Sequence, residues 1–190
     1  MLDKIYRLLE EADIVIHYNG SNFDIPTLNA EFLKGKRTPP APFQEIDLLK
    51  TCRARFRFLS NKLDYVIRFL GEDGKMKHKG MELWLGCMAN DPASWKIMTA
   101  YNKQDVVVLE RLYEKLLPWI QPHPNLGLYS GLTRPQCPNC GGLYLQARGK
   151  MRTLTMEYKR YQCMDCGKWT RTRLNDGDKE TKKNTLVGIK

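Results

Sequence analysis

Two pairs of closely spaced cysteines near the end of the 190-residue chain most constrain what it can fold into. The sequences CPNCGG (137–142) and CMDCGKW (163–169) each place two residues between their cysteines, and 22 residues separate the pairs. Four thiolates at this spacing, each pair in a turn followed by glycine, are typical of a closed tetrahedral zinc site. A redox-active motif is the alternative, but it needs one pair between a strand and a helix. The predicted ligands of a structural Zn²⁺ are Cys137, Cys140, Cys163 and Cys166.

The segment between the two pairs alternates as strands do, so we predict a small β zinc ribbon over residues 137–174. Residues 134–190 carry 13 Lys and Arg against 5 Asp and Glu, whereas residues 1–133 carry 18 against 16. A basic ribbon with aromatic residues suits nucleic-acid binding through phosphate contacts and base stacking, although the rings could instead fill a thin core. The candidate contacts are Arg148, Lys150, Arg152, Lys159, Arg160, Trp169 and Arg171.

Residues 1–120 alternate between helical and strand patterns, which predicts an α/β domain. The expected elements are a helix over 2–12, a strand over 13–17, a helix from Pro26 to Gly35, a strand over 44–48 that runs into a helix, a helix capped by Ser60, and a long helix from Pro92 to about Trp119. Residues 121–136 are rich in proline and glycine and predict a linker. The polar residues 175–190 predict a disordered tail.

The chain has no apolar run long enough to cross a bilayer and no secretory pattern at its N-terminus. Six cysteines, four of them in two pairs, do not suit a disulfide scaffold. We therefore expect a reducing, cytoplasmic setting.

Two carboxylates occupy positions where a metal site could form. Asp24 follows the strand over 13–17, so it should project from the carboxyl edge of a sheet. Tyr101 and Asp105 are four residues apart and share one face of the long helix. We expect Val106 on the buried side of that helix, which puts Asp105 at its margin, where a carboxylate needs a partner such as a cation. Three alternatives stay open: Asp24 could cap the next helix, Asp105 could be an exposed helix residue, and Tyr101 could be a core aromatic.

The stretch HYNGSNFD (17–24) resembles the second motif of the DnaQ-like (DEDD) 3′–5′ exonucleases. The stretch YNKQD (101–105) resembles the third motif of their tyrosine subtype. The flanking residues also resemble phage-type members that carry a C-terminal zinc ribbon, which would place the protein in the cytosol of a bacterium or of its phage-infected host. The resemblance implies an RNase H-like fold and phosphodiester hydrolysis with two Mg²⁺ or Mn²⁺ ions.

The same resemblance implies a role for each matching residue. Asp24 and Asp105 would each help to hold an ion, and Tyr101 would orient the attacking water. Asn19 and Phe23 would shape the slot for the terminal nucleotides.

The family's first motif, Asp-x-Glu on the first strand, has no match in this position. The one such triplet of the chain, residues 178–180, lies in the polar tail. Two carboxylates cannot hold two divalent ions in the required geometry, so we expect an incomplete RNase H-like domain, from a fragment or a split gene, with little activity alone. The alternatives are a catalytically inactive nucleic-acid-binding module and a subunit completed in trans by a fragment carrying Asp-x-Glu. The partners to consider are DNA or RNA, such a fragment, and a DNA polymerase.

Overall fold

A computed structural model describes residues 1–72 and 80–188, and it divides into two compact units, Met1–Leu116 and Leu117–Lys190. We call these the N-terminal unit and the C-terminal unit and describe each by itself. The glycine- and lysine-rich stretch 73–79 lies outside the described residues. None of the described helices is both long and apolar enough to cross a membrane.

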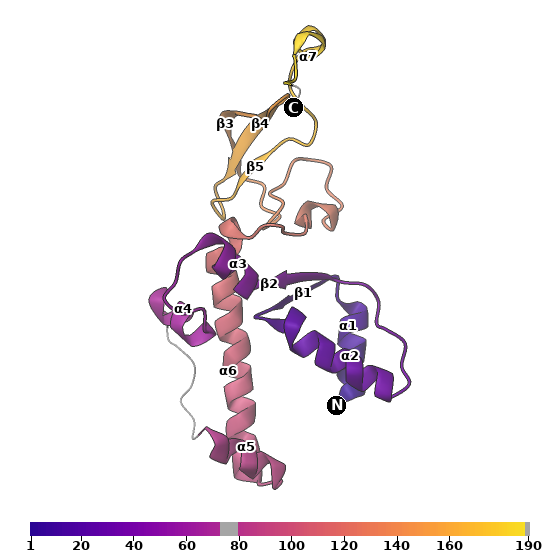
Figure 1. The fold of residues 1–190 in the computed structure, drawn as a ribbon, viewed down its shortest axis with the longest axis vertical. Coiled ribbons are helices and arrows are strands. Elements are labelled where there is room, and N and C mark those ends of the chain that lie inside the picture. The colour runs from indigo at the N-terminus through magenta and orange to yellow at the C-terminus, as the bar shows by residue number, and fades with distance from the viewer. Residues whose placement is uncertain (73–79, 189–190) are drawn as a thin grey trace. The chain divides into compact units, whose positions relative to one another are not determined.

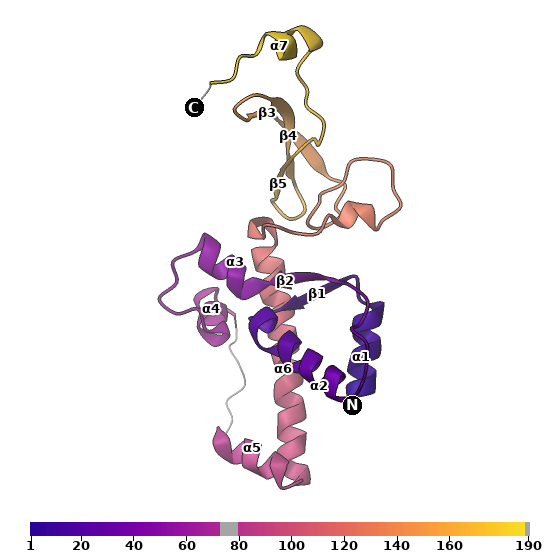
Figure 2. The same cartoon turned by 45° about the vertical axis from the view of Figure 1, so that its right-hand side comes forward.

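The N-terminal unit surrounds a two-stranded parallel sheet with helices (Figures 1 and 2). Its elements are α1 (Leu2–Glu11), β1 (Ile14–His17), the 3₁₀ turn η1 (Gly20–Asn22), α2 (Asp24–Lys34), β2 (Gln44–Asp47), α3 (Leu48–Arg55), α4 (Leu63–Phe69), α5 (Met81–Met88) and α6 (Pro92–Leu116). The sheet pairs Ile14 with Gln44 and His17 with Asp47, so both strands end at the same edge. The mixed α/β architecture agrees with the prediction from the sequence.

The core of the N-terminal unit forms where α3 and α4 lie beside α6 (Figure 1). The fully buried side chains here are Leu48 and Cys52 of α3, Val66 and Ile67 of α4, and Val108 and Leu112 of α6. Burying one such aliphatic side chain contributes about 1.5–3 kcal/mol, so these contacts hold the three helices together. A smaller cluster of Leu83, Cys87 and Met98 joins α5 to the first turns of α6.

Two expectations about these helices are wrong in detail. α4 begins at Leu63 with Lys62 as its N-cap, because Ser60 instead accepts a hydrogen bond from the Lys62 amide at 3.3 Å within the preceding loop. Val106 is 66 % exposed, whereas Val108 is fully buried. The buried stripe of α6 is therefore Val108, Leu112 and Leu116, which follow one another at a spacing of four residues.

The C-terminal unit is built on an antiparallel sheet in the order β3-β4-β5. Its elements are η2 (Leu117–Trp119), η3 (Leu126–Leu128), β3 (Leu145–Arg152), β4 (Glu157–Cys163), β5 (Trp169–Arg171) and α7 (Lys179–Asn184). The register of β3 against β4 shifts between Ala147 and Lys150, where Gly149 has a φ of 72° that non-glycine residues rarely adopt. The short helix α7 lies within residues 175–190, the part of the chain for which we predicted disorder.

Candidate functional site

The loop between β1 and α2 is tied to the neighbouring strand by one buried carboxylate. Asp47, at the end of β2, is 7 % exposed and caps α3, accepting a hydrogen bond from the Leu49 amide at 3.0 Å. The same oxygen accepts a second hydrogen bond from the amide of Asn19 at 2.9 Å. Asn19 has a φ of 67°, a left-handed conformation that asparagine tolerates better than most residues. Asp47 therefore fixes both a helix start and the loop that leads to Asp24.

His17 anchors the same loop from its other side. The Gly20 amide donates to Nδ1 of His17 at 3.0 Å, so the proton of the neutral ring lies on Nε2. Nε2 in turn donates to Glu45 at 2.9 Å, and the Ser21 hydroxyl donates to the same carboxylate oxygen at 3.0 Å. His17 is thus a buried strand residue that also positions the polar loop.

A cleft of about 770 Å³ opens where this loop faces α4 and α6. We call it the acidic cleft. It is lined by His17 and Tyr18 at the end of β1, Asp24 of α2, Lys62, Leu63 and Asp64 at the start of α4, and Asn102, Asp105, Val106 and Leu109 of α6. Two carboxylates from distant parts of the chain, Asp24 and Asp105, therefore contribute to one surface.

These two carboxylates differ in their surroundings. Asp24 is exposed and is the first residue of α2. The N-cap position belongs to Phe23, and no side chain caps this helix, so the alternative role of Asp24 as a cap is not realised. Asp105 is half-buried, three residues before the fully buried Val108. It is therefore at the margin of the core, as the sequence predicted, although Val108 rather than Val106 marks the buried side.

The structure adds a third carboxylate that sequence reasoning missed. Asp64 lines the acidic cleft from the first turn of α4 and pairs with Arg68 at 2.9 Å. An acidic residue in the first turn is ordinary for any helix, because it complements the helix dipole. The sequence therefore carried no signal that set Asp64 apart.

Comparison with known protein families assigns this part of the chain. Residues 1–117 match the family model described as the RNase_H superfamily. The chain belongs to the RNase H superfamily. A search of curated proteins returned no match. Membership supports an RNase H-like domain that acts on nucleic acid as a nuclease and uses divalent metal ions.

The acidic cleft of this RNase H-like domain fits such ions in its chemistry. Carboxylate oxygens are the ligands that Mg²⁺ and Mn²⁺ prefer. The cleft is nonetheless open: among the described residues, the cysteines of the C-terminal unit are the one group of three or more candidate ligands gathered within 4.8 Å. Asp24 and Asp105 are thus suitable ligands that do not by themselves form a closed cage.

The other residues predicted for the RNase H-like site, Tyr101, Phe23 and Asn19, are not among those that line the acidic cleft. Tyr101 packs against the cluster of Leu83, Cys87 and Met98, one helical turn from Asp105. Phe23 is 69 % exposed beside Asp24. The side chain of Asn19 accepts a hydrogen bond from Asn22 at 3.1 Å. The catalytic role of Tyr101 stays a prediction, and so do the substrate contacts of Asn19 and Phe23.

The C-terminal unit gathers the four paired cysteines so that their sulfur atoms all lie within 4.8 Å of one another. Cys137 and Cys166 approach to 3.6 Å between sulfurs, as do Cys140 and Cys163. Sulfurs held tetrahedrally about 2.3 Å from one zinc ion would be about 3.8 Å apart, whereas disulfide sulfurs are bonded at about 2.0 Å. The cluster is therefore compatible with a zinc site.

Two buried polar side chains brace this cysteine cluster. Asn139, between the first two cysteines, is 2 % exposed and donates to the carbonyl of Leu117 at 2.7 Å. Lys168 follows the second pair, is 7 % exposed, and donates to the carbonyl of Ile120 at 2.9 Å. These bonds fix both cysteine turns to the segment over 117–120 and take the Lys168 ammonium out of the solvent-exposed basic surface.

Five of the six basic residues predicted to contact nucleic acid fall into two groups, and Arg148 stands apart. Lys150 and Arg152 both pair with Glu157, and Lys159 pairs with Asp176 at 3.5 Å. Arg160 and Arg171 instead lie over aromatic rings, those of Trp169 and Tyr158. Arg148 is exposed, and its carbonyl accepts a hydrogen bond from Arg160 at 2.9 Å.

Proposed function

We propose that this protein is a metal-dependent 3′–5′ exonuclease of the DnaQ-like tyrosine subtype, which hydrolyses phosphodiester bonds of DNA or RNA. The observation that carries the proposal is that Asp24 and Asp105, the aspartates of two separate motifs, line one cleft of an RNase H-like domain. Asp24 lies at the start of α2, after the loop that follows β1, and Asp105 lies on α6.

The chemistry follows from these positions. Divalent ions supply charge that stabilises the leaving oxygen and lowers the pKa of an attacking water. Asp24 and Asp105 would hold the ions, and Asp64 offers a further carboxylate in the same cleft. The DnaQ-like resemblance further gives Tyr101 the role of orienting the water, which requires its hydroxyl to reach the cleft from its place beside Leu83, Cys87 and Met98. The exposed ring of Phe23 would contact the terminal base.

A labelled-strand assay tests this function. The 190-residue chain, loaded with zinc, is incubated with Mg²⁺ or Mn²⁺ and a single strand labelled at its 3′ end or at its 5′ end. Early release of a labelled mononucleotide from the 3′ label alone is the expected result, at a low rate because no Asp-x-Glu carboxylates are among the described residues that line the cleft. Asp24→Asn and Asp105→Asn should each lower the rate by more than about 100-fold, because each removes a metal ligand.

The matched control is Glu110→Gln, which neutralises an exposed carboxylate on the same helix away from the cleft. It should leave the rate unchanged. Full activity in Asp105→Asn would contradict the assignment of the site, and release from the 5′ label would contradict the direction.

A second candidate function is suggested by the open arrangement of the cleft. The carboxylates are not gathered as a group of three within 4.8 Å among the described residues, and the Asp-x-Glu triplet at 178–180 belongs to the start of α7 rather than to a strand. A module that binds nucleic acid without cutting it would show strand binding with no nucleotide release under any of these conditions.

A third candidate is completion in trans. β1 pairs with β2 along one side, and the described residues supply no strand for its other side, which leaves an edge that can accept a strand. Activity that arises only when a polypeptide with a strand bearing Asp-x-Glu is added would support this candidate over the second.

A further inference from the structure

Two cavities of the C-terminal unit differ in the charges that line them. The first is lined by both signs: Lys150, Arg152 and Lys182 alternate with Glu157, Asp176 and Asp178. Some of these cations already have a carboxylate partner from the same chain, as Arg152 has in Glu157 at 2.8 Å. A phosphate arriving here would have to compete with carboxylates that are already in place.

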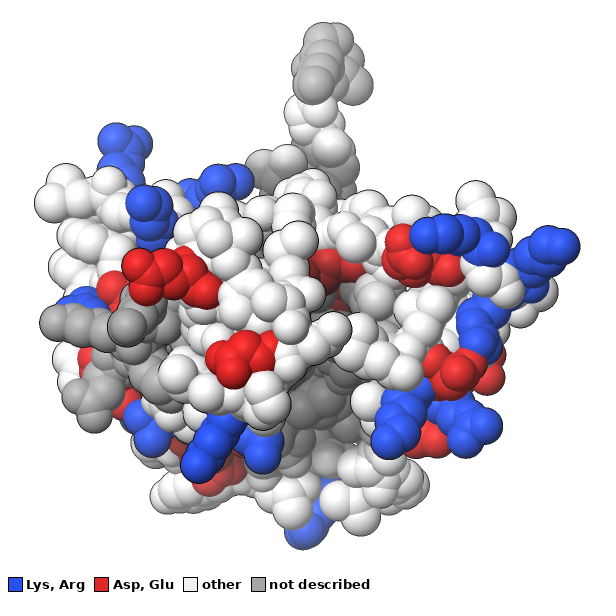
Figure 3. Space-filling model, turned by 90° about the horizontal axis from the view of Figure 1, so that it is seen from below, with Lys and Arg blue, Asp and Glu red and all other residues white. Residues whose placement is uncertain are grey.

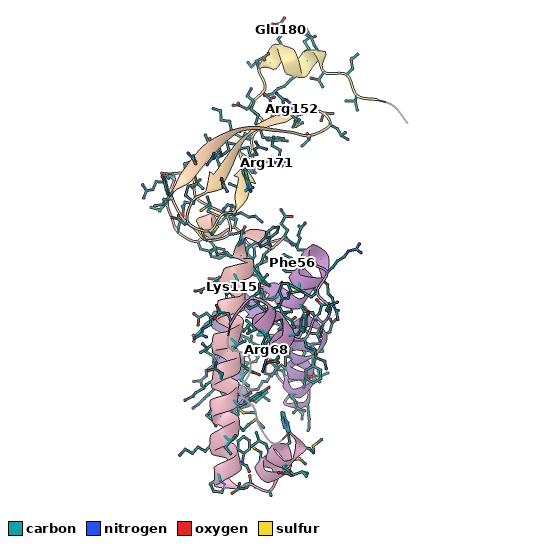
Figure 4. The ribbon with its side chains drawn as sticks, turned by 90° about the vertical axis from the view of Figure 1, so that its left-hand side faces the viewer. Phe56, Arg68, Lys115, Arg152, Arg171 and Glu180 are labelled. Carbon is teal, nitrogen blue, oxygen red and sulfur yellow. The ribbon has the colours of Figure 1, made fainter. Side chains whose placement is uncertain are left out.

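The second cavity, of about 570 Å³, has no acidic side chain among the described residues that line it. We call it the basic groove. Its exposed cationic members are Arg160, Arg171 and Arg173. Lys168 also lines the groove, but its ammonium is buried against the carbonyl of Ile120. Figure 4 shows Arg171 on β5 and Arg152 at the end of β3. Met151 of β3 also lines the basic groove, whereas its neighbours Lys150 and Arg152 line the first cavity, so successive side chains of β3 belong to different cavities.

Aromatic rings accompany the cations of the basic groove. Trp169 lines the groove, is 49 % exposed, and has the guanidinium of Arg160 at 4.9 Å from its ring centroid. The guanidinium of Arg171 lies 3.8 Å from the ring centroid of the nearly buried Tyr158. Such stacking holds the cations in place, so less side-chain entropy is lost when an anion binds.

We propose that the basic groove binds single-stranded nucleic acid, with a base stacked on Trp169 and phosphates on Arg171 and Arg173. The choice of ligand rests on the proposed nuclease function. A cationic groove with an accessible aromatic face is the combination that single strands require, because every base has a face that can stack. Bases of a duplex are already stacked on one another, so a duplex offers this groove its phosphates alone.

The proposal selects among the nucleic-acid contacts predicted from the sequence. Lys150, Arg152 and Lys159 belong to the same basic stretch of sequence, but each forms an ion pair, the first two with Glu157 and the third with Asp176. We expect these three residues to contribute little to binding.

Fluorescence anisotropy with a labelled 12-nucleotide strand tests the groove. The full chain is used with zinc present, and it carries Asp105→Asn so that the strand is not digested. Trp169→Ala should weaken binding by about 10-fold or more, the usual effect of losing one stacked base. Arg171→Ala with Arg173→Ala should also weaken it and reduce the slope of log affinity against log salt by about 1.4, because two single-strand phosphate contacts are lost.

The matched control is Lys150→Ala with Arg152→Ala, which removes the same charge from the paired cavity and should change affinity by less than about twofold. Trp169→Phe keeps a ring and should retain most of the affinity, which separates stacking from misfolding. Equal losses from the two double variants, or equal affinity for duplex and single strand, would overturn the proposal. Complete displacement of the labelled strand by inorganic pyrophosphate, at the same total phosphate concentration as a competing unlabelled strand, would also overturn it. That result would indicate a site for anions in general.

Failure of this proposal can be told apart from failure of the nuclease function. Hydrolysis of the p-nitrophenyl ester of thymidine 5′-monophosphate needs the acidic cleft but no extended strand. The groove variants, made without the Asp105 substitution, should hydrolyse this ester at the normal rate and long strands more slowly. Loss of ester hydrolysis in the groove variants would contradict the separation of the two sites.

Discussion

At the scale of single residues, Gly20, in the polar loop between β1 and α2, occupies a position with no room for a side chain. A Cβ atom placed on Gly20 would lie 2.6 Å from Cγ of His17, much closer than real Cβ contacts. The ring cannot retreat without breaking its hydrogen bonds to the Gly20 amide and to Glu45. Gly20 is therefore needed for space, and the loop that presents Asp24 depends on it.

We predict that Gly20→Ala lowers the free energy of unfolding by about 1–3 kcal/mol, the usual cost of forcing extra volume into a packed site. It should also slow nucleotide release, because the loop before Asp24 is displaced. Urea unfolding and the labelled-strand assay measure the two effects. Gly188→Ala, at a position with no atom within 4 Å of the added Cβ, should change neither. An unchanged stability in Gly20→Ala would show that the loop can rearrange freely.

A second prediction at this scale concerns pH. Burial lowers the pKa of His123, and the charge of Lys168 lowers it further, although a hydrogen bond to the carbonyl of Pro124 opposes both. The unfolded chain then binds the proton more tightly than the folded chain, so stability falls as the pH drops below the ordinary histidine value of about 6.5.

Thermal unfolding at pH 7.5 and pH 5.5 checks this sign. The loss of stability on acidification should be smaller in His123→Gln than in the natural sequence. Protonation of the zinc-binding cysteines affects both proteins alike, so the difference between them measures the contribution of His123. The same or a larger loss in His123→Gln would refute the prediction.

At the scale of elements, one carboxylate joins a strand, a helix and a loop. Asp47 ends β2, caps α3 and binds the amide of Asn19, so its removal leaves two backbone amides without their acceptor. Asp91 is a suitable comparison, since it also caps a helix start and accepts a hydrogen bond from the Ser94 amide at 2.8 Å. Its carboxylate bonds to residues of that helix start, whereas Asp47 also binds the amide of a distant loop.

We predict that Asp47→Ala costs about 1–2 kcal/mol for the lost cap and more for the buried amide of Asn19. Asp91→Ala should cost less. Urea unfolding ranks the two, and the labelled-strand assay should show slower hydrolysis in Asp47→Ala alone. Equal effects of both variants on hydrolysis would mean that Asp47 acts only as a helix cap.

The accuracy of the sequence-based elements follows the strength of their local signals. The strand 13–17, the helix beginning near Pro26 and the long helix from Pro92 were predicted because β-branched runs, a proline at the first turn and a clear helical period are short-range features. α5 was not predicted, since its sequence MELWLGCM is apolar on all sides and leaves Met81 and Met88 largely exposed. The sequence analysis placed Val106 on the buried side of α6, whereas Val108 is the buried residue. Three adjacent valines, 106–108, fit more than one choice of apolar face on a helix.

At the scale of the whole molecule, charge and cysteine chemistry separate the two units. Residues 1–133 are nearly balanced in charge, and on the face drawn in Figure 3 the acidic and basic side chains are interspersed without a patch of one sign. The four clustered cysteines belong to the C-terminal unit, whereas Cys52 and Cys87 are buried in the N-terminal unit. Burial raises the pKa of Cys52 to about 11, so its thiol is unreactive at neutral pH.

We predict that the folded protein binds one zinc ion and that a chelator exposes four thiols. A thiol-reactive dye at pH 7.5 should modify no cysteine with zinc present, four after chelation, and six in denaturant. Loss of the β-sheet signal of the C-terminal unit should accompany chelation, because so small a sheet depends on its metal. Modification of six thiols by chelation alone would show that the N-terminal unit unfolds with it.

The sequence by itself determined the features that depend on neighbours along the chain. The spacing of the cysteines, the strand that delivers Asp24 and the helical face shared by Tyr101 and Asp105 are all short-range patterns, since backbone geometry relates residues a few positions apart. Only the tertiary structure decided that Asp24, Asp64 and Asp105 line one cleft, that Tyr101 packs against α5, and that the basic residues divide between paired cations and an open groove. These facts depend on which distant segments meet and which charges find partners there, and no local pattern encodes that.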